Sequence, residues 1–258
     1  MINRDTLYNL SQKHVIRGYL DKSLCLYNPK EVYEALTKNE VVVGWLKFIA
    51  YYYTPPPHKK VLLLYPCSTV KPYHMSRSYI ALFKTLKSLG EDIRKLIHVV
   101  TISEPFGLIP EEYYNKRFVW YDCPGLFKWW CRKVGQPYEE KYVERSINIL
   151  SKYISHFLKR TRNIYLLRIA FVRTFSSKLR VLKDHTHRRM IERASKMSDV
   201  VINLLPPLEV VKLIVMKRGA VAWDFYGVAH PIAQAHLKEF LLKKMKQLSI
   251  TTRTIYKL

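Results

Sequence analysis

A cysteine that is followed at once by polar residues is the feature of this chain that most suggests chemistry. Cys67 comes directly after the apolar run at 61–65, and Ser68, Lys71 and Tyr73 follow within six residues. A thiolate is a strong nucleophile, and backbone donors at a helix start together with a nearby lysine stabilise its charge. We therefore take Cys67 as a candidate nucleophile, with a buried structural cysteine as the alternative.

The residues after Cys67 offer contacts for an anion and for a base. Ser68, Ser76 and Ser78 supply hydroxyls and backbone N–H groups at a helix start, which suits a phosphate or a carboxylate. Lys71 adds a positive charge for the same anions, and Tyr73 offers a ring on which an unpaired base could stack. Ordinary helix capping is the alternative for the serines.

Acidic residues later in the chain are candidates for proton transfer. Asp122 lies beside Pro124 and could accept a proton from a substrate or bind the edge of a nucleobase, with a capped loop as the alternative. Glu104 and Glu111 flank a turn that could border the same pocket, although one of them could instead cap the next helix.

Metal and cofactor motifs do not stand out in the sequence. His185, His187 and His230 form no ligand spacing, so we predict solvated or capping histidines and no metal site. The chain has neither a P-loop nor a GxGxxG fingerprint, so we expect no nucleotide cofactor. The four cysteines form no CxxC pair and are expected to be thiols.

The elements that position these residues follow from the apolar runs. These runs predict strands at 60–65, 98–102, 164–171 and 200–204, with helical patterns between them. This order predicts an α/β fold, a mostly parallel sheet flanked by helices. Ligands of such sheets bind beyond the carboxyl ends of the strands, so the segments 66–78, 103–112 and 121–125 are expected to share one crevice.

Capping residues and prolines divide the chain. Asn28, Pro29 and Glu31 predict a helix start, with the helix running to about Tyr53, and the triplet 55–57 ends it. We predict a helical N-terminal annex at 1–58 and an α/β core domain at 59–258 with a basic C-terminal part. Further helices are expected at 76–89 and 232–248.

The charge of the chain predicts a polyanionic partner. The 258 residues include 44 Lys and Arg against 20 Asp and Glu, a formal net charge of +24, and nucleic acid is the leading candidate. No apolar stretch reaches the length of a bilayer span and no secretory signal is present, so we expect no membrane and a cytoplasmic protein. A basic stretch is the candidate nucleic-acid surface; its residues are Arg173, Lys178, Arg180, Lys183, Arg188, Arg189, Arg193 and Lys196.

Three segments together resemble the core domain of archaeal archaeosine synthase. The stretch 66–79 reads Pro-Cys, three residues, Lys-Pro-Tyr, two residues, then Ser-Arg-Ser-Tyr, and it departs from the family pattern only at Tyr79, where the family has histidine. The stretch 103–112 is similar to the family's Ser-x-Pro-x-Gly-Leu-Val-Pro-x-Glu, and 121–124 is similar to its Tyr-Asp-x-Pro. The resemblance covers roughly residues 60–170.

The resemblance implies a fold, a reaction and a set of residues. The implied fold is uracil-DNA glycosylase-like, and the implied reaction adds free lysine to the nitrile of 7-cyano-7-deazaguanine in tRNA, giving an amidine. Cys67 and Asp122 would be catalytic. The substrate would contact Ser68, Lys71, Tyr73, Ser76, Ser78, Tyr79 and Glu104.

Two alternatives remain open at this point. Longer family members append transglycosylase-like and PUA modules, so this chain could be a non-catalytic tRNA-binding subunit whose protein partner supplies them, and the departure at Tyr79 favours this hypothesis. The other alternative is a DNA repair protein that flips a base and activates water through Asp122.

Overall fold

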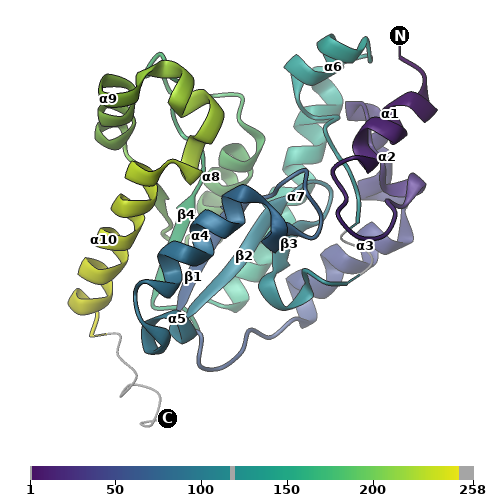
Figure 1. The fold of residues 1–258 in the computed structure, drawn as a ribbon. Helices are drawn as coiled ribbons and strands as arrows, with labels where there is room; N and C mark the ends of the chain where they lie inside the picture. Colours follow the sequence, from purple (N-terminus) through teal and green to yellow (C-terminus); the bar gives the residue numbers. More distant parts are fainter. Residues whose placement is uncertain (1, 117–119, 250–258) are drawn as a thin grey trace.

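A five-stranded sheet runs through the middle of the molecule (Figure 1). The computed structural model describes residues 2–116 and 120–249. The strand order is β3–β2–β1–β4–β5, and the bounds are β1 Val61–Pro66, β2 Ile97–Ser103, β3 Gly107–Pro110, β4 Leu167–Phe171 and β5 Asn203–Leu205. β1, β2, β4 and β5 run parallel, whereas β3 pairs antiparallel with β2. The predicted α/β fold with a mostly parallel sheet is confirmed.

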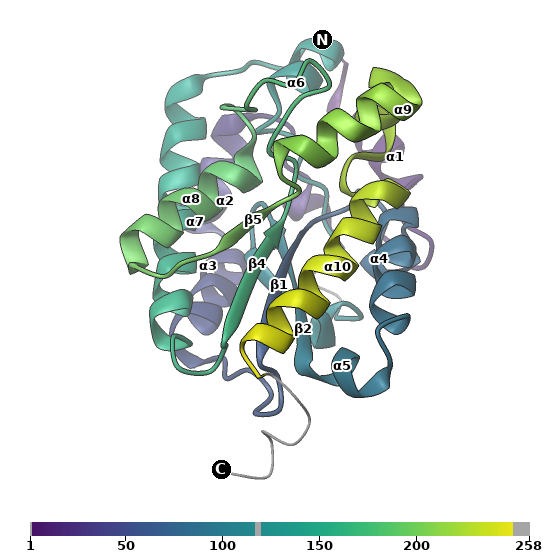
Figure 2. The same cartoon turned by 90° about the vertical axis from the view of Figure 1, so that its left-hand side faces the viewer.

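Helices cover both faces of this sheet, as Figure 2 shows. α7 and α8 lie on one face together with α2 and α3, and α4, α5 and α10 lie on the other face. The helices are α1 Arg4–Gln12, α2 Pro29–Lys38, α3 Glu40–Lys47, α4 Arg77–Lys87, α5 Glu91–Leu96, α6 Lys128–Val134, α7 Glu140–Arg160, α8 Thr186–Ser198, α9 Leu208–Tyr226 and α10 Pro231–Gln247. Within 2–116 and 120–249, none of them is long and apolar enough to cross a bilayer.

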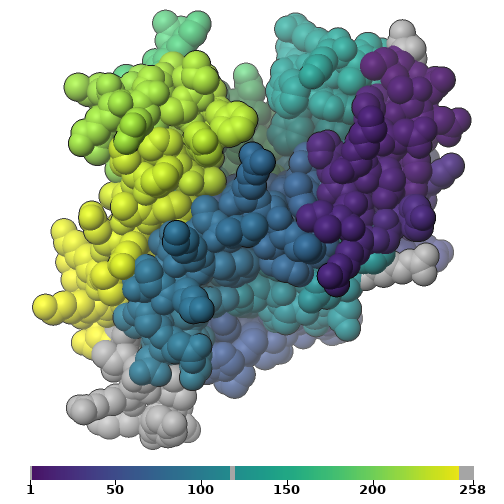
Figure 3. All heavy atoms as spheres, viewed as in Figure 1, coloured from purple at the N-terminus to yellow at the C-terminus, as the bar shows by residue number. Residues whose placement is uncertain are grey.

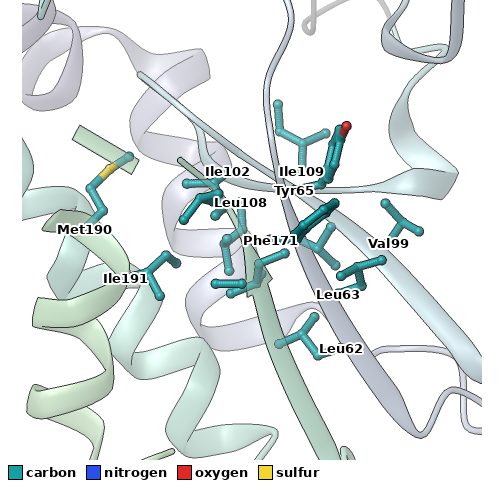
Figure 4. Packing of buried hydrophobic residues seen from close by; sticks show 14 of the residues in the cluster. Leu62, Leu63, Tyr65, Val99, Ile102, Leu108, Ile109, Phe171, Met190 and Ile191 are labelled. Atoms are coloured by element: carbon teal, nitrogen blue, oxygen red, sulfur yellow. The ribbon is translucent and has the colours of Figure 1, made fainter. Parts of the chain in front are cut away.

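The core forms where the covered strands meet these helices (Figure 4). Leu62, Leu63 and Tyr65 of β1 have no exposed surface, as expected for a central strand with both faces covered. Met190 and Ile191 of α8 pack in the same core. Each such aliphatic side chain contributes about 2 kcal/mol through its burial, so this core fixes the strands whose ends carry the candidate site.

The helix that begins at Pro29 shows how local capping overrides a longer apolar pattern. The amide of Glu31 donates to Oδ1 of Asn28 at 3.0 Å, which confirms Asn28 as the N-cap. Oδ1 of Asn39 accepts a hydrogen bond from the amide of Val42 at 3.1 Å and starts a new helix there. The single helix predicted up to about Tyr53 is therefore divided into α2, α3 and a final wide turn at Phe48–Tyr52.

The N-terminal helices and the sheet share one hydrophobic core. Leu36 of α2 and Leu46 of α3 belong to the same buried cluster as the strands. A second, smaller cluster packs α1 against α6 through Leu7, Tyr27 and Val134. The division into 1–58 and 59–258 stays a prediction.

The antiparallel direction of β3 places Glu111 away from the crevice that we expected it to border. Because β3 runs opposite to β2, the residues after Pro110 lie beside Ile97, where β2 begins. There Glu111 pairs with Lys59 at 3.0 Å and with Arg94. Of the two flanking carboxylates, Glu104 alone remains at the carboxyl ends of the strands.

Candidate active site

A cavity of about 200 Å³ opens at the carboxyl ends of the strands. Figure 3 shows the surface hollowed between the purple N-terminal segment, the teal α6 and the green α9. The predicted residues Cys67, Ser68, Lys71, Glu104 and Asp122 all line this cavity. The other walls come from α1 and α6, so segments far apart in sequence form one pocket.

Cys67 lies directly after the last residue of β1. Its amide donates to the carbonyl oxygen of Ile102 at 3.0 Å, which extends the β1–β2 pairing by one residue and fixes the cysteine at the strand end. The thiol is half-buried, whereas Cys25, Cys123 and Cys131 are buried. Cys67 is therefore the most accessible thiol in the described part of the chain.

His187 brings an imidazole to Cys67 from a distant part of the sequence. Its Nε2 lies 3.7 Å from Sγ of Cys67 and 3.1 Å from Oε2 of Glu104. His187 and Glu104 are both almost fully buried, at 4% and 2% exposed. Burial opposes the charge of the imidazole, but Glu104 and Cys67 outweigh it and raise the pKa of His187 to about 10.

Glu104 is the second member of a buried ion pair. Burial opposes its ionisation, but His187 holds the pKa of Glu104 below the usual value of a glutamate. The imidazole is therefore positively charged at neutral pH, and a positive charge next to a sulfur atom stabilises a thiolate. This arrangement is able to prepare Cys67 for nucleophilic attack.

Lys71 lies in the wall of the same cavity with almost no exposed surface. Its Nζ donates to the carbonyl oxygen of Ser68 at 2.6 Å and lies 4.8 Å and 4.7 Å from the ring centroids of Tyr73 and Tyr121. Burial lowers the pKa of Lys71, while Cys67 and Asp122 counteract the shift. A lysine in this state is a candidate for donating a proton or binding an anion inside the cavity.

Asp122 lines the cavity from a segment whose backbone is hydrogen-bonded to residues 24–26. Its backbone exchanges hydrogen bonds with Leu24 and Leu26, and its Oδ2 accepts a hydrogen bond from Ser11 of α1 at 2.5 Å. The carboxylate lines the cavity and keeps other acceptor sites, since an ionised carboxylate accepts up to about four hydrogen bonds.

The remaining predicted substrate contacts separate into two groups. Ser76 and Ser78 line a second, larger cavity of about 600 Å³ that adjoins the first at Ser68. Ser76 also caps α4, because its Oγ accepts a hydrogen bond from the amide of Tyr79 at 3.3 Å. Both the capping and the ligand-binding interpretation of Ser76 therefore remain compatible with its position.

Tyr73 and Tyr79 have no exposed surface. Their rings stack at 5.5 Å between centroids, and the hydroxyl of Tyr79 bonds to Thr101 and to the carbonyl oxygen of Pro66. Burial raises the pKa of both phenols well above the usual value. In this conformation neither ring has a free face for a base.

The basic stretch divides into paired and unpaired cations. Arg173 binds Asp224 at 3.0 Å, Arg188 binds Glu192 at 2.6 Å, and Arg189 and Arg193 both bind Glu144 of α7. The pairs with Asp224 and Glu144 hold the loop before α8, and α8 itself, against α9 and α7, whereas Arg188 and Glu192 pair within α8. Four further cations are exposed and have no ion pair in the part of the chain that the structure describes: Lys178, Arg180, Lys183 and Lys196.

Our sequence interpretation missed His187. We predicted a solvated or capping histidine, but the side chain is buried against Cys67 and Glu104. The signal was its position at the start of the helix after β4, because this connection lies at the same edge of the sheet as the loops after β1 and β2. The capping interpretation holds for His230, whose Nδ1 accepts a hydrogen bond from the amide of Ile232 at 3.2 Å.

Fold and site together define an α/β protein with a thiol, an imidazole and a carboxylate in a cleft at the strand ends. The chain belongs to the family described as "Domain of unknown function (DUF5591)", whose model matches residues 42–187. Cys67, Glu104, Asp122 and His187 all lie within this range.

Relatives of known name are archaeosine synthases. The chain is 35% identical over 81 residues to archaeosine synthase subunit alpha of Thermococcus kodakarensis, covering 31% of this chain and 14% of the relative. It is 42% identical over 79 residues to the subunit alpha of Methanosarcina acetivorans, covering 31% and 12%. The match to the subunit alpha of Thermoplasma acidophilum is 32% over 119 residues, covering 45% and 19%. The chain therefore contains an archaeosine synthase-related domain and spans less than a fifth of these relatives.

Among solved structures, the crystal structure of AF0587, a protein of unknown function, aligns with a TM-score of 0.41 at 15% identity, covering 76% of this chain and 49% of that chain.

Proposed function

We propose that this chain acts in archaeosine-type tRNA modification and that its cleft transfers free lysine to the nitrile of 7-cyano-7-deazaguanine in tRNA. The observation that supports this most strongly is the half-buried thiol of Cys67 at the cavity, 3.7 Å from the buried imidazole of His187. The names of the relatives support the choice of reaction.

The proposed reaction begins when the sulfur of Cys67 adds to the nitrile carbon. The C–S bond forms between the thiolate and the nitrile carbon, one π bond of the nitrile opens, and the nitrile nitrogen takes a proton from the ammonium of Lys71, which gives a thioimidate. The imidazolium of His187 stabilises the thiolate before attack. Lys71 lines the same cavity, and its ammonium is a suitable donor for the nitrogen that gains negative charge.

The second half of the reaction releases the enzyme. The side-chain amine of lysine adds to the thioimidate carbon, the C–S bond breaks, and Cys67 leaves as the thiolate. The amine proton passes to Lys71, which regains its charge. The product is an amidine, and nothing is oxidised or reduced. Asp122 is suited to accept the amine proton on the way, because it lines the same cavity as Cys67.

We propose that tRNA approaches over the loop between β4 and α8. Lys178, Arg180 and Lys183 lie in this loop, are exposed, and have no acidic partner in the described ranges. The loop leads directly into His187, so phosphate contacts there would guide a nucleotide toward the cavity. A protein partner that carries transglycosylase-like or PUA modules would extend this surface.

A second candidate function is a non-catalytic tRNA-binding subunit. Tyr79 favours it, because the family histidine is replaced here by a phenol that is buried and bonded to Thr101. Base excision from DNA by a uracil-DNA glycosylase-like protein is the third possibility. Titration with tRNA and with duplex DNA at fixed salt separates the two partners, and equal affinity for both would contradict tRNA specificity.

The test is to incubate the full chain with free lysine and tRNA that carries 7-cyano-7-deazaguanine, and to weigh the digested nucleosides. We expect a mass gain of one lysine, lost in Cys67→Ser and kept in Cys123→Ser, a matched control because Cys123 lines the same cavity but is buried. Full turnover by Cys67→Ser would exclude the thioimidate. No gain in the unaltered chain, together with tRNA binding, would support the subunit function instead.

A further inference from the structure

Three different metal-binding side chains converge beside the cavity. The sulfur of Cys67, Nε2 of His187 and Oε2 of Glu104 come from three separate elements, and candidate ligand atoms of these residues all lie within 4.8 Å of one another. We propose that they form a three-ligand site for a single zinc ion, and that zinc bound there withdraws the Cys67 thiolate from reaction.

The hydrogen-bond geometry does not match a relay through the imidazole. In a catalytic triad the nucleophile and the carboxylate bind opposite ring nitrogens of the histidine. Here Cys67 and Glu104 both approach Nε2, at 3.7 Å and 3.1 Å, while Nδ1 of His187 is buried and has no hydrogen-bond partner within 2–116 and 120–249. One proton on Nε2 cannot serve both acceptors well, whereas one cation placed between the three atoms can.

Two of the three ligand separations match tetrahedral coordination of zinc. Zinc lies about 2.3 Å from a thiolate sulfur and about 2.0–2.2 Å from an imidazole nitrogen or a carboxylate oxygen. Tetrahedral angles then separate sulfur from nitrogen by about 3.6 Å and nitrogen from oxygen by about 3.3 Å. The observed separations of 3.7 Å and 3.1 Å are close to these values. The sulfur and the carboxylate oxygen lie within 4.8 Å of each other, so one of these side chains moves inward when the ion binds.

The charges and the ligand types favour zinc over magnesium or calcium. A thiolate, a carboxylate and a neutral imidazole carry two negative charges, which balance a divalent cation in a buried place. Sulfur and nitrogen ligands select zinc and its neighbours, whereas magnesium and calcium prefer all-oxygen sites. Three protein ligands leave a fourth position open, and because Cys67 and Glu104 both line the cavity, a water or small ligand could occupy it from there.

The effect of the ion on chemistry rests on the proposed function. A thiolate that binds zinc shares an electron pair with the metal and is a weaker nucleophile than the free thiolate, so bound zinc and the nitrile compete for Cys67. The zinc site itself depends only on the three side chains. We expect turnover to fall in proportion to the occupied fraction of the site and to return when a chelator removes the ion.

The experiment uses the full chain without an affinity tag, reduced and stripped by a chelator, and then titrated with Zn²⁺. We expect one bound ion per chain, protection of Cys67 from alkylation as the ion binds, and a thiolate charge-transfer band when Co²⁺ replaces Zn²⁺. Replacing an outer-shell partner weakens metal binding about 10–100-fold. Loss of a direct ligand in Cys67→Ser, Glu104→Gln or His187→Gln should weaken it by at least about tenfold.

Two matched controls should leave binding unchanged. Cys123→Ser removes another thiol of the cavity, and His185→Gln removes the neighbouring imidazole, whose ring centroid lies 5.5 Å from that of His187. Absence of saturable binding, or equal weakening in the controls, would overturn the proposal. If a variant at a buried ligand fails to fold, the unaltered chain still tests the proposal. Zinc binding that does not protect Cys67 from alkylation would contradict it.

The failure of each proposal has a different signature. If the stripped chain binds no zinc but transfers lysine, the proposed zinc site is wrong and the proposed function is supported. If the chain binds one zinc ion through Cys67 but transfers no lysine, the proposed function is wrong and the zinc site is supported.

Discussion

Nε2 of His187 lies 3.7 Å from Sγ of Cys67, although 120 residues separate them in sequence. The contact is possible because β1 and β4 are neighbours in the sheet and run parallel. The loop after β1 and the start of the helix after β4 therefore lie at the same edge. Most of the predictions below concern this edge.

We expect His187→Gln to slow both the alkylation of Cys67 and lysine transfer in metal-free protein. An opposite charge in contact favours an ionised group by about tenfold or more, so we expect a loss of at least about tenfold. Glutamine keeps a polar side chain next to Glu104 but lacks the charge of the imidazolium. Alkylation rates and nucleoside masses measure the two effects. His185→Gln is the control, because burial lowers the pKa of His185 to about 3 and keeps that ring neutral. Equal losses in both variants would contradict a specific role for His187.

Tyr79→Phe should leave lysine transfer unchanged and lower stability modestly. The hydroxyl bonds to Thr101 and Pro66 inside the core, and a buried hydrogen bond of this kind contributes about 1 kcal/mol. Urea denaturation and the nucleoside assay separate the two quantities. If turnover falls without a matching loss of folded protein, Tyr79 has a role in the reaction that its buried position does not show.

Glu111→Gln should destabilise the fold at neutral pH by about 2 kcal/mol, because it leaves Lys59 and Arg94 without their shared carboxylate. Burial opposes ionisation, but Arg94 and Lys59 hold the pKa of Glu111 below its usual value. A lowered pKa stabilises the folded state above the unfolded pKa of about 4.3, and this stabilisation is lost as the pH falls through the folded value.

The difference in unfolding free energy between Glu111→Gln and the unaltered chain should therefore shrink as the pH falls below about 4. Urea denaturation at a series of pH values measures it. Glu91→Gln is the matched control, because Glu91 is 86% exposed and forms a surface pair with Lys95 at 3.8 Å. Such a pair contributes less than about 1 kcal/mol. A pH-independent difference for Glu111→Gln would contradict the assigned ion pair.

Charge reversal in the loop before α8 should weaken tRNA binding. Lys178 and Lys183 are exposed near the cleft, so Lys178→Glu with Lys183→Glu should lower affinity about tenfold at fixed salt and reduce its salt dependence. Lys243→Glu with Lys246→Glu changes the net charge equally on the last turns of α10, at the opposite end of the sheet (Figure 2). Equal losses for both pairs would mean that tRNA senses only the overall charge.

The sequence was sufficient for the features that depend on short-range patterns. The apolar run after Lys60 predicted the central strand, and Asn28 with Pro29 predicted the start of α2. The loop after β1 was predicted to meet Asp122 because ligands gather at the carboxyl ends of parallel strands, and the cavity contains both.

Other features depend on contacts that no local pattern carries. The pairing of Arg189 and Arg193 with Glu144 depends on α7 packing beside α8, so the sequence showed a free basic face where the structure has ion pairs. The edge strand β3 is four residues long and follows a turn, so it was not distinguished from a loop.

The residues that line the cavity come partly from inside and partly from outside the stretch that matches the family. The groups that could react lie within the family match at residues 42–187, whereas Leu7, Leu10 and Ser11, which close one side of the cavity, lie before it. The reacting groups and part of the cavity wall are therefore encoded in different stretches of the gene. Substitutions at Leu7 or Leu10 can change the shape of the cavity without removing a reacting group, whereas Ser11 also bonds to Asp122. Natural variation or protein engineering at the two leucines can therefore alter substrate choice while the reacting side chains stay the same.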